Sequence, residues 1–319
     1  MTPSSNQNAK RVKVLVLGSG PAGYAAALYA ARAELKPVVL TGMQLGGQVA
    51  LTFTVENYPG FPEGVGGAQL GELFQKQAEH FGATTEFDMA NSVDLSERPF
   101  KVRTDSGEYQ ADTLIVTTGA SSNMLEVPGE RDLTGRGVSY CATCDGWFFK
   151  DKKVTVVGGG DSALEEALFL TRYASQVTIV HRREELRAGV LLQNRARQHE
   201  KIRFIWNTVV TEAVGTGKLE AVRLKNVQSG EESLLETDGL FIFIGHTPST
   251  GMFQGQLEMD PLGYLKINER METSVPGVFA AGEAADPHFR QVVTSAGMGA
   301  AAAIQATRFL EAEEAQQPA

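Results

Sequence analysis

The sequence has 319 residues, of which 42% are hydrophobic and 21% charged, as in globular chains with room for two domains. Its net charge of −9 argues against a nucleic acid or an anionic membrane as the main partner. No segment reaches the run of about 18 apolar residues that a membrane helix needs. Residues 1–8 are polar and lack the apolar core of a secretory signal, so we expect a cytoplasmic protein. Residues 311–319 are acidic and polar, which predicts a disordered tail.

The chain begins with a predicted strand, a glycine-rich turn and a helix. Residues 12–17 are apolar and β-branched, which is typical of a buried parallel strand. They lead into a G-x-G-x-x-G turn at residues 18–23, followed by a helical stretch and a second strand at residues 37–40. Glycines let the backbone approach a pyrophosphate, and the helix N-terminus supplies unpaired N–H groups. The predicted dinucleotide contacts in this turn are Gly18, Gly20, Pro21, Ala22 and Gly23.

The residue after the second strand of such a unit contacts the ribose. An acid there accepts from the 2′-hydroxyl, whereas an arginine accommodates a 2′-phosphate. Thr41 is neither, so the first unit does not resemble an NAD site. Residues 41–48 add glycines and backbone donors, which suits a larger dinucleotide such as FAD, although the residues alone do not decide for a flavin. The candidate contacts here are Thr41, Gly42, Gly46, Gly47 and Gln48.

The only two cysteines of the chain, Cys141 and Cys144, have C-x-x-C spacing, and Asp145 follows them directly. This spacing holds two sulfurs close together while one thiolate stays open to attack, which is typical of a redox pair. Half of a zinc site is the alternative, but zinc takes about four ligands. The sequence has no further cysteine and no histidines at ligand spacing, so we expect no metal.

The first unit recurs 140 residues later, because Gly158, Gly160 and Ala163 stand at that offset from Gly18, Gly20 and Gly23. Residues 154–157 form the strand and residues 177–180 the second strand. Two such units at one offset are far more specific than a single glycine-rich turn. The second turn predicts another nucleotide site, with Gly158, Gly160, Asp161, Ser162 and Ala163 as contacts.

Basic residues occupy the ribose position of the second unit. His181, Arg182 and Arg183 stand there, with Arg187 one turn further on, and the position itself holds no acid. Guanidinium groups bind a 2′-phosphate, which favours NADPH over NADH; the alternative is a solvated basic start of a helix. On the helix after the turn, Glu165 or its neighbour Glu166 could bond the nicotinamide, and a solvated helix face explains them equally well.

Both units close with a hydrophobic strand that ends at a glycine. Residues 111–119 and 237–245 are these strands, and they add Thr118 and Gly119 to the first site and Ile244 and Gly245 to the second. Turn signals at residues 105–107 and 228–230 predict a small antiparallel layer in each unit. The strand at residues 278–283 needs a sheet to join, so the second unit is predicted to be inserted into the first.

The predicted fold is therefore α/β. Two Rossmann-like nucleotide-binding domains, each with three layers (ββα), are expected. The inserted domain spans residues 121–248, and the discontinuous one spans residues 1–120 and 249–319.

Together these residues resemble the low-molecular-weight, bacterial-type thioredoxin reductases of the pyridine nucleotide-disulfide oxidoreductase family, over nearly the whole chain. The string C-A-T-C-D-G between two nucleotide units is the most specific feature. The matching motifs are G-S-G-P-A-G at 18–23, G-G-Q at 46–48, V-E-N-Y-P-G at 55–60, C-A-T-C-D-G at 141–146, G-G-G at 158–160, H-R-R at 181–183, G-H-T-P at 245–248 and R-Q at 290–291.

The resemblance implies an FAD domain in two segments, an inserted NADPH domain that carries the cysteines, and a homodimer. It implies that electrons pass from NADPH to FAD, then to the cysteine pair and on to thioredoxin. Cys144 would face the flavin, Cys141 would attack the thioredoxin disulfide, and Asp145 would donate and accept the proton. The implied flavin-binding positions in the last third of the chain and at the V-E-N-Y-P-G motif are Asn57, Gly282, Glu283, Arg290, Gln291 and Val292.

Domain rotation follows from the same resemblance. Cysteines and NADPH belong to one domain and cannot occupy the same flavin face at once, so the family rotates that domain. The expected hinges are residues 119–123 and 246–251, which contain Gly, Ser or Thr. A thioredoxin-docking patch is expected at Arg136, Trp147 and Phe148; the alternative is that these aromatic residues pack in the domain core.

Three residues depart from the family pattern. Glu283 stands where aspartate is usual, and its extra methylene moves the carboxylate expected to hold the flavin ribitol. Asp161 replaces a common asparagine and is expected to cap the helix, because its charge would repel NADPH. Ser249 replaces a common asparagine and has no predicted role.

Other functions are compatible with parts of the pattern. A redox-sensing or scaffold flavoprotein would bind nucleotides without turnover, but the basic ribose position and the intact Cys144 and Asp145 favour an enzyme. A relative could instead reduce a different thioredoxin-like protein, or act as a dithiol oxidase that passes electrons to oxygen. The intact NADPH unit argues against the oxidase.

Overall fold

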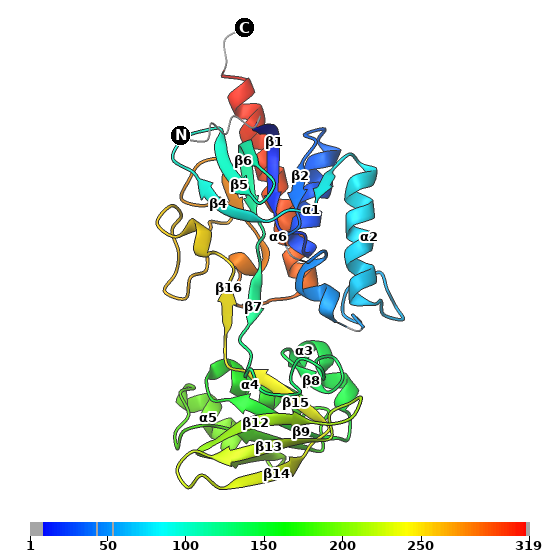
Figure 1. Ribbon diagram of the computed structural model, residues 1–319, viewed down its shortest axis with the longest axis vertical. Helices are drawn as coiled ribbons and strands as arrows, with labels where there is room; N and C mark the ends of the chain where they lie inside the picture. Colours follow the sequence, from blue (N-terminus) through cyan, green and yellow to red (C-terminus); the bar gives the residue numbers. More distant parts are fainter. Residues whose placement is uncertain (1–8, 43, 53, 317–319) are drawn as a thin grey trace, which may run out of the picture. The chain divides into compact units, whose positions relative to one another are not determined.

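The computed structural model describes residues 9–42, 44–52 and 54–316. The polar start at residues 1–8, Met43 in the glycine-rich segment and the last tail residues, 317–319, lie outside the described residues. The chain divides into two compact units (Figure 1). Unit 1 contains the residues up to Ser121 and those from Thr247 onward, and unit 2 is Ser122–His246.

Unit 1 is a mixed sheet covered by three helices. Its strands are β1 (Lys10–Leu17), β2 (Val38–Leu40), β3 (Thr84–Glu86), β4 (Ala90–Asp94), β5 (Phe100–Thr104), β6 (Glu108–Val116) and β17 (Val278–Ala280), and its helices are α1 (Pro21–Arg32), α2 (Gly67–His80) and α6 (Val292–Glu314). Strands β3, β2, β1, β6 and β17 are neighbours in this order, and each neighbouring pair is parallel. On β6, strand β5 pairs antiparallel, and β4 pairs antiparallel with β5. The last part of the chain thus supplies β17 to the sheet begun by the first part, as predicted.

Strand β6 joins the two parts of this sheet. Its first half pairs antiparallel with β5, where Phe100 faces Ala111, and its second half pairs parallel with β17, where Val278 faces Leu114. The hairpin predicted at residues 105–107 is confirmed between β5 and β6. The antiparallel strands of unit 1 are therefore continuous with its parallel sheet.

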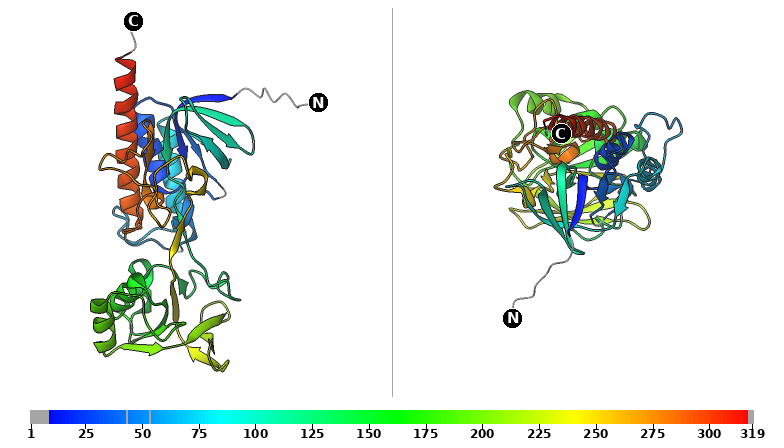
Figure 2. Two further views of the ribbon diagram at one scale, coloured as in Figure 1. Left: turned by 90° about the vertical axis from the view of Figure 1, so that its left-hand side faces the viewer. Right: turned by 90° about the horizontal axis from the view of Figure 1, so that it is seen from above.

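Small residues let α1 and α6 pack closely on the parallel sheet. Ala26, Ala27 and Ala30 of α1 are fully buried, as are Ala302 and Ala303 of α6. A Cβ at residue 299 would lie 2.0 Å from the carbonyl oxygen of Ala22, so only glycine allows this crossing. Figure 2 shows α6 running along unit 1 beside the sheet. The C-terminal helix is thereby held against the first glycine-rich turn.

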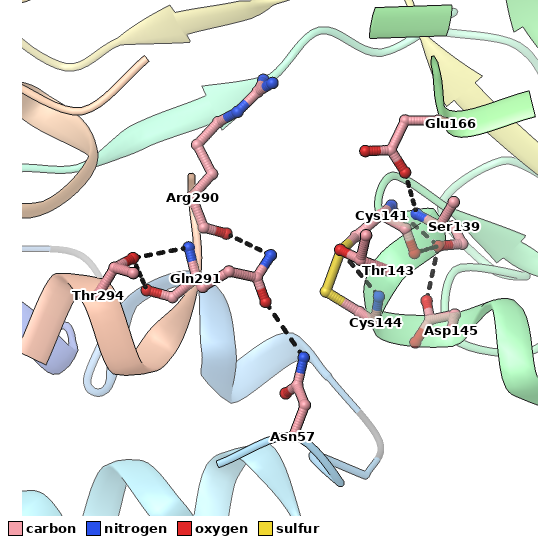
Figure 3. The surroundings of a disulfide bond; sticks show 11 residues. Asn57, Ser139, Cys141, Thr143, Cys144, Asp145, Glu166, Arg290, Gln291 and Thr294 are labelled. Carbon is pink, nitrogen blue, oxygen red and sulfur yellow. Dashed lines mark hydrogen bonds between the residues drawn. A yellow bond between two sulfur atoms is a disulfide. The ribbon is translucent and has the colours of Figure 1, made fainter. Parts of the chain in front are cut away.

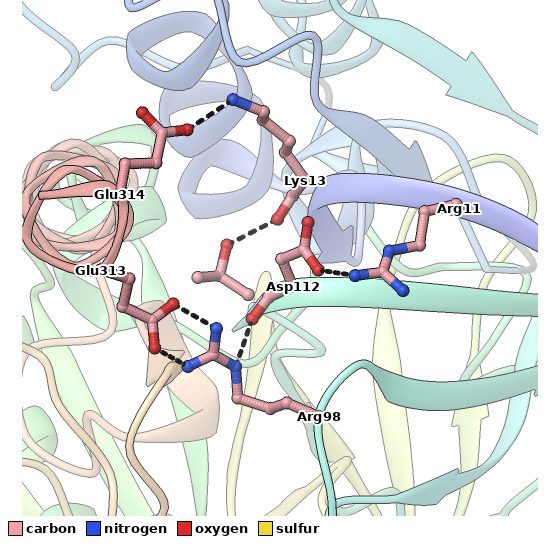
Figure 4. Close-up of polar contacts among 7 residues, drawn as sticks. Arg11, Lys13, Arg98, Asp112, Glu313 and Glu314 are labelled. Carbon is pink, nitrogen blue, oxygen red and sulfur yellow. Dashed lines mark hydrogen bonds and ion pairs between the residues drawn. The ribbon is translucent and has the colours of Figure 1, made fainter. Parts of the chain in front are cut away.

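The acidic tail is helical for longer than the sequence predicts. Residues 311–314 continue α6, so the prediction of disorder is wrong for them. Glu313 forms an ion pair with Arg98, and a carboxylate oxygen of Glu314 lies 2.9 Å from the Nζ of Lys13 (Figure 4). The Arg98 guanidinium also stacks on the ring of Phe309, 4.8 Å from its centroid. Exposed ion pairs stabilise little on their own, so the buried Leu310 one turn earlier is the stronger anchor.

Unit 2 has three layers, as predicted. Its strands are β8 (Val138–Ser139), β9 (Lys153–Gly158), β10 (Gln176–Val180), β11 (Ile202–Ile205), β12 (Thr208–Val214), β13 (Ala221–Asn226), β14 (Glu232–Glu236) and β15 (Gly239–Phe243), and its helices are α3 (Ala142–Asp145), α4 (Asp161–Leu170) and α5 (Val190–Gln198). A parallel sheet of order β11-β10-β9-β15-β8 has α4 and α5 on one face and the antiparallel sheet β12-β13-β14 on the other. The predicted turn at residues 228–230 connects β13 and β14.

The internal repeat is visible in the backbone of both units. The first helices begin at Pro21 and Asp161, 140 residues apart. Gly18 and Gly158 have φ angles of +112° and +153°. A Cβ added at Gly18 would lie 2.3 Å from the carbonyl oxygen of Thr117, and one added at Gly158 would lie 2.5 Å from the carbonyl oxygen of Phe243. Each turn thus requires glycine for the same reason, which is the close approach of the closing strand.

Two short strands carry the chain out of unit 1 and back. They are β7 (Ala120–Ser122) and β16 (His246–Pro248), which pair with each other. Both lie within the segments predicted to cross between the domains. Gly119 and Gly245 border them with φ angles of +69° and +110°, which favour glycine. No helix in the described ranges is long and apolar enough to cross a membrane.

Candidate active site and cofactor sites

The predicted flavin contacts of unit 1 gather at the carboxyl edge of its parallel sheet. Leu17 pairs with both Leu40 and Val116, and Val116 also pairs with Ala280. The carboxyl ends of these four strands therefore lie side by side, and the segments that follow them leave the sheet at the same edge. They bring to one edge the turn at residues 18–23, Thr41 and Gly42, Thr118 and Gly119, and Gly282 and Glu283.

Hydrogen bonds and glycines shape this edge into a cradle. The buried Ser19 hydroxyl donates to the carbonyl oxygens of Thr41 and Gln44, at 3.1 and 3.0 Å, which ties the segment 41–48 to the first turn. A Cβ at Gly47 would lie 3.0 Å from the Cα of Gly20. Gln48 lies in the short 3₁₀ turn Gly47–Leu51. Two glycine backbones thus approach each other with no side chain between them.

A bound dinucleotide fits an unsatisfied group in this cradle. The hydroxyl of Thr118 is buried and has no hydrogen-bond partner among the described residues. An unpaired buried hydroxyl is costly, and a polar group of a ligand would satisfy it. The residues present therefore fit the FAD that the resemblance of the motifs implies.

Two more predicted flavin contacts meet through their side chains. The amide nitrogen of Asn57 donates to the side-chain oxygen of Gln291 at 3.1 Å (Figure 3). Gln291 also caps α6 in a reciprocal capping box with Thr294, which fixes where that helix begins, at Val292. Arg290 precedes it with φ of +50°. The V-E-N-Y-P-G loop and the start of α6 thus form one local structure.

Asp286 was missed from the sequence and organises the loop that carries Arg290. Its buried carboxylate accepts the backbone N–H groups of His288, Phe289 and Arg290, at 2.9, 3.0 and 3.2 Å. An aspartate followed by a short turn is a common signal of such a loop.

Glu283, another predicted flavin contact, lies near Asp286. Burial raises the pKa of Glu283 to about 7, although Arg290 opposes this shift and Asp286 adds to it.

The cysteine pair of unit 2 lies at the carboxyl edge of the second parallel sheet. Strand β8 pairs with β15, where Ser139 faces Phe241, and Cys141 follows two residues later. Cys141 and Cys144 form a disulfide across the short helix α3. Val157 of β9 pairs with Ile242 and Val180, so the second glycine turn and the basic loop leave the same edge. Disulfide and predicted nucleotide turn are therefore neighbours in one unit.

Ser139 connects the disulfide to the predicted acid. Its hydroxyl accepts the N–H of Cys141 at 3.1 Å and donates to the carboxylate of Asp145 at 2.6 Å (Figure 3). Burial raises the pKa of Asp145 above its usual value, and the hydrogen bond from Ser139 lowers it in part. A raised pKa suits a group that must donate a proton near neutral pH. Sequence reasoning found Asp145 but not Ser139.

Glu166 links the nucleotide helix to the disulfide helix. Its carboxylate on α4 accepts the N–H of Ala142 at 3.1 Å, at the start of α3. Of the two glutamates proposed for the nicotinamide, Glu166 therefore has this contact within the protein, whereas Glu165 is exposed. No sequence signal distinguishes them, because both stand on one amphipathic helix.

A second buried carboxylate, Glu130, supports the same region. It is fully buried and accepts the N–H groups of Leu125 and Val127 and the hydroxyl of Tyr140, at 2.9, 3.2 and 2.8 Å. Tyr140 directly precedes Cys141, and burial together with Glu130 raises its pKa. The segment after β7 is thereby connected to the residue before the disulfide. This contact was not anticipated, because Glu130 itself belongs to no recognised motif.

The basic residues of unit 2 lie on a loop. Arg182, Arg183 and Arg187 lie between β10 and α5, so the alternative is wrong in placing them at a helix start, although they are exposed to solvent as it expects. None of them takes part in an ion pair among the residues that the structure describes. Their charges are thus available to an anionic ligand.

Buried contacts hold this loop in place. His181 is buried, and its Nε2 lies 3.0 Å from the backbone carbonyl oxygen of Glu185. The imidazole ring leaves no room for a Cβ at Gly159. The N–H groups of Arg187 and Ala188 donate to the Gly159 oxygen at 2.7 and 3.2 Å. The His181 ring thus lies between the glycine turn and the loop. Burial lowers its pKa.

Asp161 supports the same loop and does not cap its helix. The N-cap of α4 is Gly160, which has no side-chain cap, and the Asp161 carboxylate accepts the N–H of Gly189 at 2.7 Å. The prediction of a cap is therefore wrong, because Asp161 is the first residue inside the helix and its carboxylate binds the loop instead. Ser249, another departure, is exposed and donates its N–H to Gly119, and nothing in the structure explains its side chain.

The aromatic residues after the disulfide divide into two groups. Trp147 and Phe148 are 56% and 42% exposed, so the alternative that they pack in the domain core is wrong, whereas the next residue, Phe149, is buried. Trp147 stacks edge-on with Tyr173, and Lys150 lies 5.8 Å from its ring. Arg136 is exposed as well. These side chains are available to a partner.

Two similar nucleotide-binding folds and one disulfide beside the second define a nucleotide-dependent disulfide oxidoreductase. The pyridine nucleotide-disulphide oxidoreductase family matches residues 12–299. The chain is 51% identical over 303 residues to the thioredoxin reductase of Rickettsia conorii (strain ATCC VR-613 / Malish 7). The aligned region covers 93% of this chain and 98% of that protein. It is 49% identical over 303 residues to that of Mycolicibacterium smegmatis, with 94% and 97% covered.

A solved structure agrees with these relatives. The crystal structure of thioredoxin reductase from Streptococcus pyogenes MGAS5005 has a TM-score of 0.91 at 40% identity, covering 96% of this chain and 100% of that one. The chain belongs to the pyridine nucleotide-disulphide oxidoreductase family and, within it, to the thioredoxin reductases. The resemblance predicted from the motifs is confirmed.

Proposed function

We propose that this oxidoreductase uses NADPH and bound FAD to reduce the disulfide of thioredoxin. The observation that carries the proposal is the Cys141–Cys144 disulfide at the same sheet edge as the second glycine turn, with Glu166 joining the two. The named relatives, which are thioredoxin reductases, support the choice of substrate.

The two compact units are proposed as the two cofactor domains. The FAD domain would be residues 1–120 and 249–319, and its cradle at Gly18–Gly23 and Thr118 would hold the dinucleotide. The NADPH domain would be residues 121–248, with the 2′-phosphate on Arg182, Arg183 and Arg187. When bound, FAD supplies two-electron transfer between the nicotinamide and the disulfide. The protein residues position both ends of that transfer.

Each residue of the disulfide site has a proposed role. Cys144 would accept electrons first, and Cys141 would attack the partner disulfide. Asp145 would supply the one proton that the reduced cysteine pair takes up, and its raised pKa keeps the acid form present to a higher pH. Trp147, Phe148 and Arg136 would hold thioredoxin beside Cys141. A homodimer in the cytoplasm is part of the same proposal.

The direct test is an assay with the purified protein. We expect it to carry yellow flavin and to oxidise NADPH faster than NADH when bacterial thioredoxins are supplied. Equal consumption of NADPH with oxygen alone, and no reduction of any thioredoxin, would favour a dithiol oxidase. Flavin and nucleotide binding without turnover would favour a sensor or scaffold.

Removing the basic side chains should lower the preference for NADPH. Replacing Arg182 or Arg183 by alanine is expected to raise the KM for NADPH about 10- to 100-fold, because a hydrogen bond to a charged group contributes about 1.5–3 kcal/mol. The KM for NADH should change little, since NADH lacks the 2′-phosphate. Steady-state kinetics with both nucleotides measures this, and an equal rise for both would contradict the assignment.

Reversing the charge at Arg136 should weaken docking of the partner. Arg136→Glu is expected to raise the KM for thioredoxin several-fold, because the cation proposed to contact the partner is replaced by an anion. NADPH-to-dye reduction should stay unchanged, as it needs no protein partner. Lys225→Glu on β13 is the matched control, since it makes the same charge change elsewhere on unit 2. Equal losses in both assays would exclude a docking role.

A further inference from the structure

The two sulfurs of the disulfide differ in the hydrogen bonds that they receive. The N–H of Cys144 points at the Sγ of Cys141 across 3.2 Å, so Cys141 serves as the N-cap of α3. The hydroxyl of Thr143 lies 3.4 Å from the same sulfur. A disulfide sulfur carries no hydrogen, so Thr143 must be the donor. Within the described ranges, no hydrogen bond to the Sγ of Cys144 is found.

These two donors are arranged around Cys141 before the disulfide opens. A sulfur in a disulfide is a weak acceptor, whereas a thiolate carries a full negative charge and binds donors more strongly. The backbone N–H is fixed by the turn of α3, and the hydroxyl belongs to a β-branched residue with few χ1 choices. Little reorganisation is therefore needed when the charge appears on Cys141.

We propose that Thr143 is a positioning residue which, with the N–H of Cys144, holds Cys141 as a thiolate once the disulfide is reduced. This inference rests on the proposed function and deepens it, since it says why Cys141 is the attacking sulfur. The thiolate attacks one sulfur of the partner disulfide, a mixed disulfide forms, and the other partner sulfur leaves as a thiolate. Electrons and charge balance without a further reagent.

The experiment uses the fact that the chain has two cysteines only. In a Cys144→Ser background, Cys141 is the single thiol, and the N–H at position 144 is retained. The rate of alkylation by iodoacetamide, followed by intact mass across pH in the flavin-loaded protein, gives the pKa of Cys141. Adding Thr143→Val removes the hydroxyl at nearly constant shape. Thr143→Ser keeps it and is the matched control.

Thr143→Val is expected to raise the pKa of Cys141 by about one unit, so that the thiolate fraction at lower pH falls about tenfold. Thr143→Ser should stay close to the parent. In a Cys141→Ser background, where Cys144 is the single thiol, Thr143→Val should leave the pKa of Cys144 unchanged. Retained flavin and an unchanged far-UV spectrum show that the variants fold, and Thr143→Ala replaces the valine variant if it does not.

Superimposable titrations of the parent and the valine variant would overturn the inference. So would an equal shift at Cys144, which would indicate a general change around α3. The alkylation needs no partner protein, so failure of the parent enzyme to reduce thioredoxin would count against the proposed function alone. The two failures are thereby separate results.

Discussion

Asp145→Asn is expected to slow NADPH-dependent reduction of thioredoxin by about 10²- to 10⁴-fold, the usual effect of removing a general acid. Breaking the disulfide with two electrons leaves two sulfurs that cannot both remain charged side by side. Asp145 is the carboxyl group next to them, and its hydroxyl partner Ser139 already contacts the N–H of Cys141. Stopped-flow and steady-state kinetics with thioredoxin measure the loss.

The controls for this prediction separate proton transfer from damage to the site. Asparagine keeps an oxygen that can accept from Ser139, so the local structure should persist. NADPH-to-dye reduction, which bypasses the disulfide, should remain near the parent rate. An asparagine variant with full thioredoxin turnover would exclude Asp145 as the acid.

The pH dependence has a defined sign. Burial raises the pKa of Asp145, so its acid form persists to higher pH, and the rate should fall as pH rises through that pKa. Asp145→Asn should abolish this fall. Ser139→Ala removes the bond that favours the carboxylate, so the fall should move to higher pH. A movement to lower pH would contradict the role given to Ser139.

The sequence predicted the parts of the fold that depend on short, periodic signals. Buried strands and glycine turns recur at one offset, and the steric reason for Gly18 and Gly158 is the same in both units. The insertion followed because the strand at residues 278–283 had no sheet of its own. Such features are local in sequence, or repeated, and a single chain is enough to find them.

Contacts between distant residues were not predictable in the same way. Asp161 was expected at a helix cap, but the donor that it binds, Gly189, comes from a loop 28 residues away. Glu166 and Glu130 have ordinary surroundings in the sequence, and only the packing of unit 2 shows that one reaches α3 and the other Tyr140. The acidic end of α6 was misjudged because composition does not show that Leu310 is buried one turn earlier, nor that Arg98 and Lys13 pair with its glutamates.

A crosslink that fixes unit 1 to unit 2 is expected to abolish thioredoxin turnover. The cysteines and the proposed NADPH site share unit 2, and both must reach the cofactor proposed for unit 1. One fixed arrangement can serve only one of these encounters. The strands β7 and β16, bordered by Gly119 and Gly245, are the two places where the chain passes between the units, so we propose that rotation occurs there.

The crosslink must resist NADPH and thiols, so it should join introduced groups other than cysteine. Either bleaching of the flavin by NADPH or reduction of the disulfide should survive, while the complete cycle is lost. The same two positions modified without being joined are the control and should retain turnover. Cleaving a cleavable version of the linker should restore it. Normal thioredoxin turnover in protein verified to be fully crosslinked would refute the rotation, because a single arrangement would then serve both encounters.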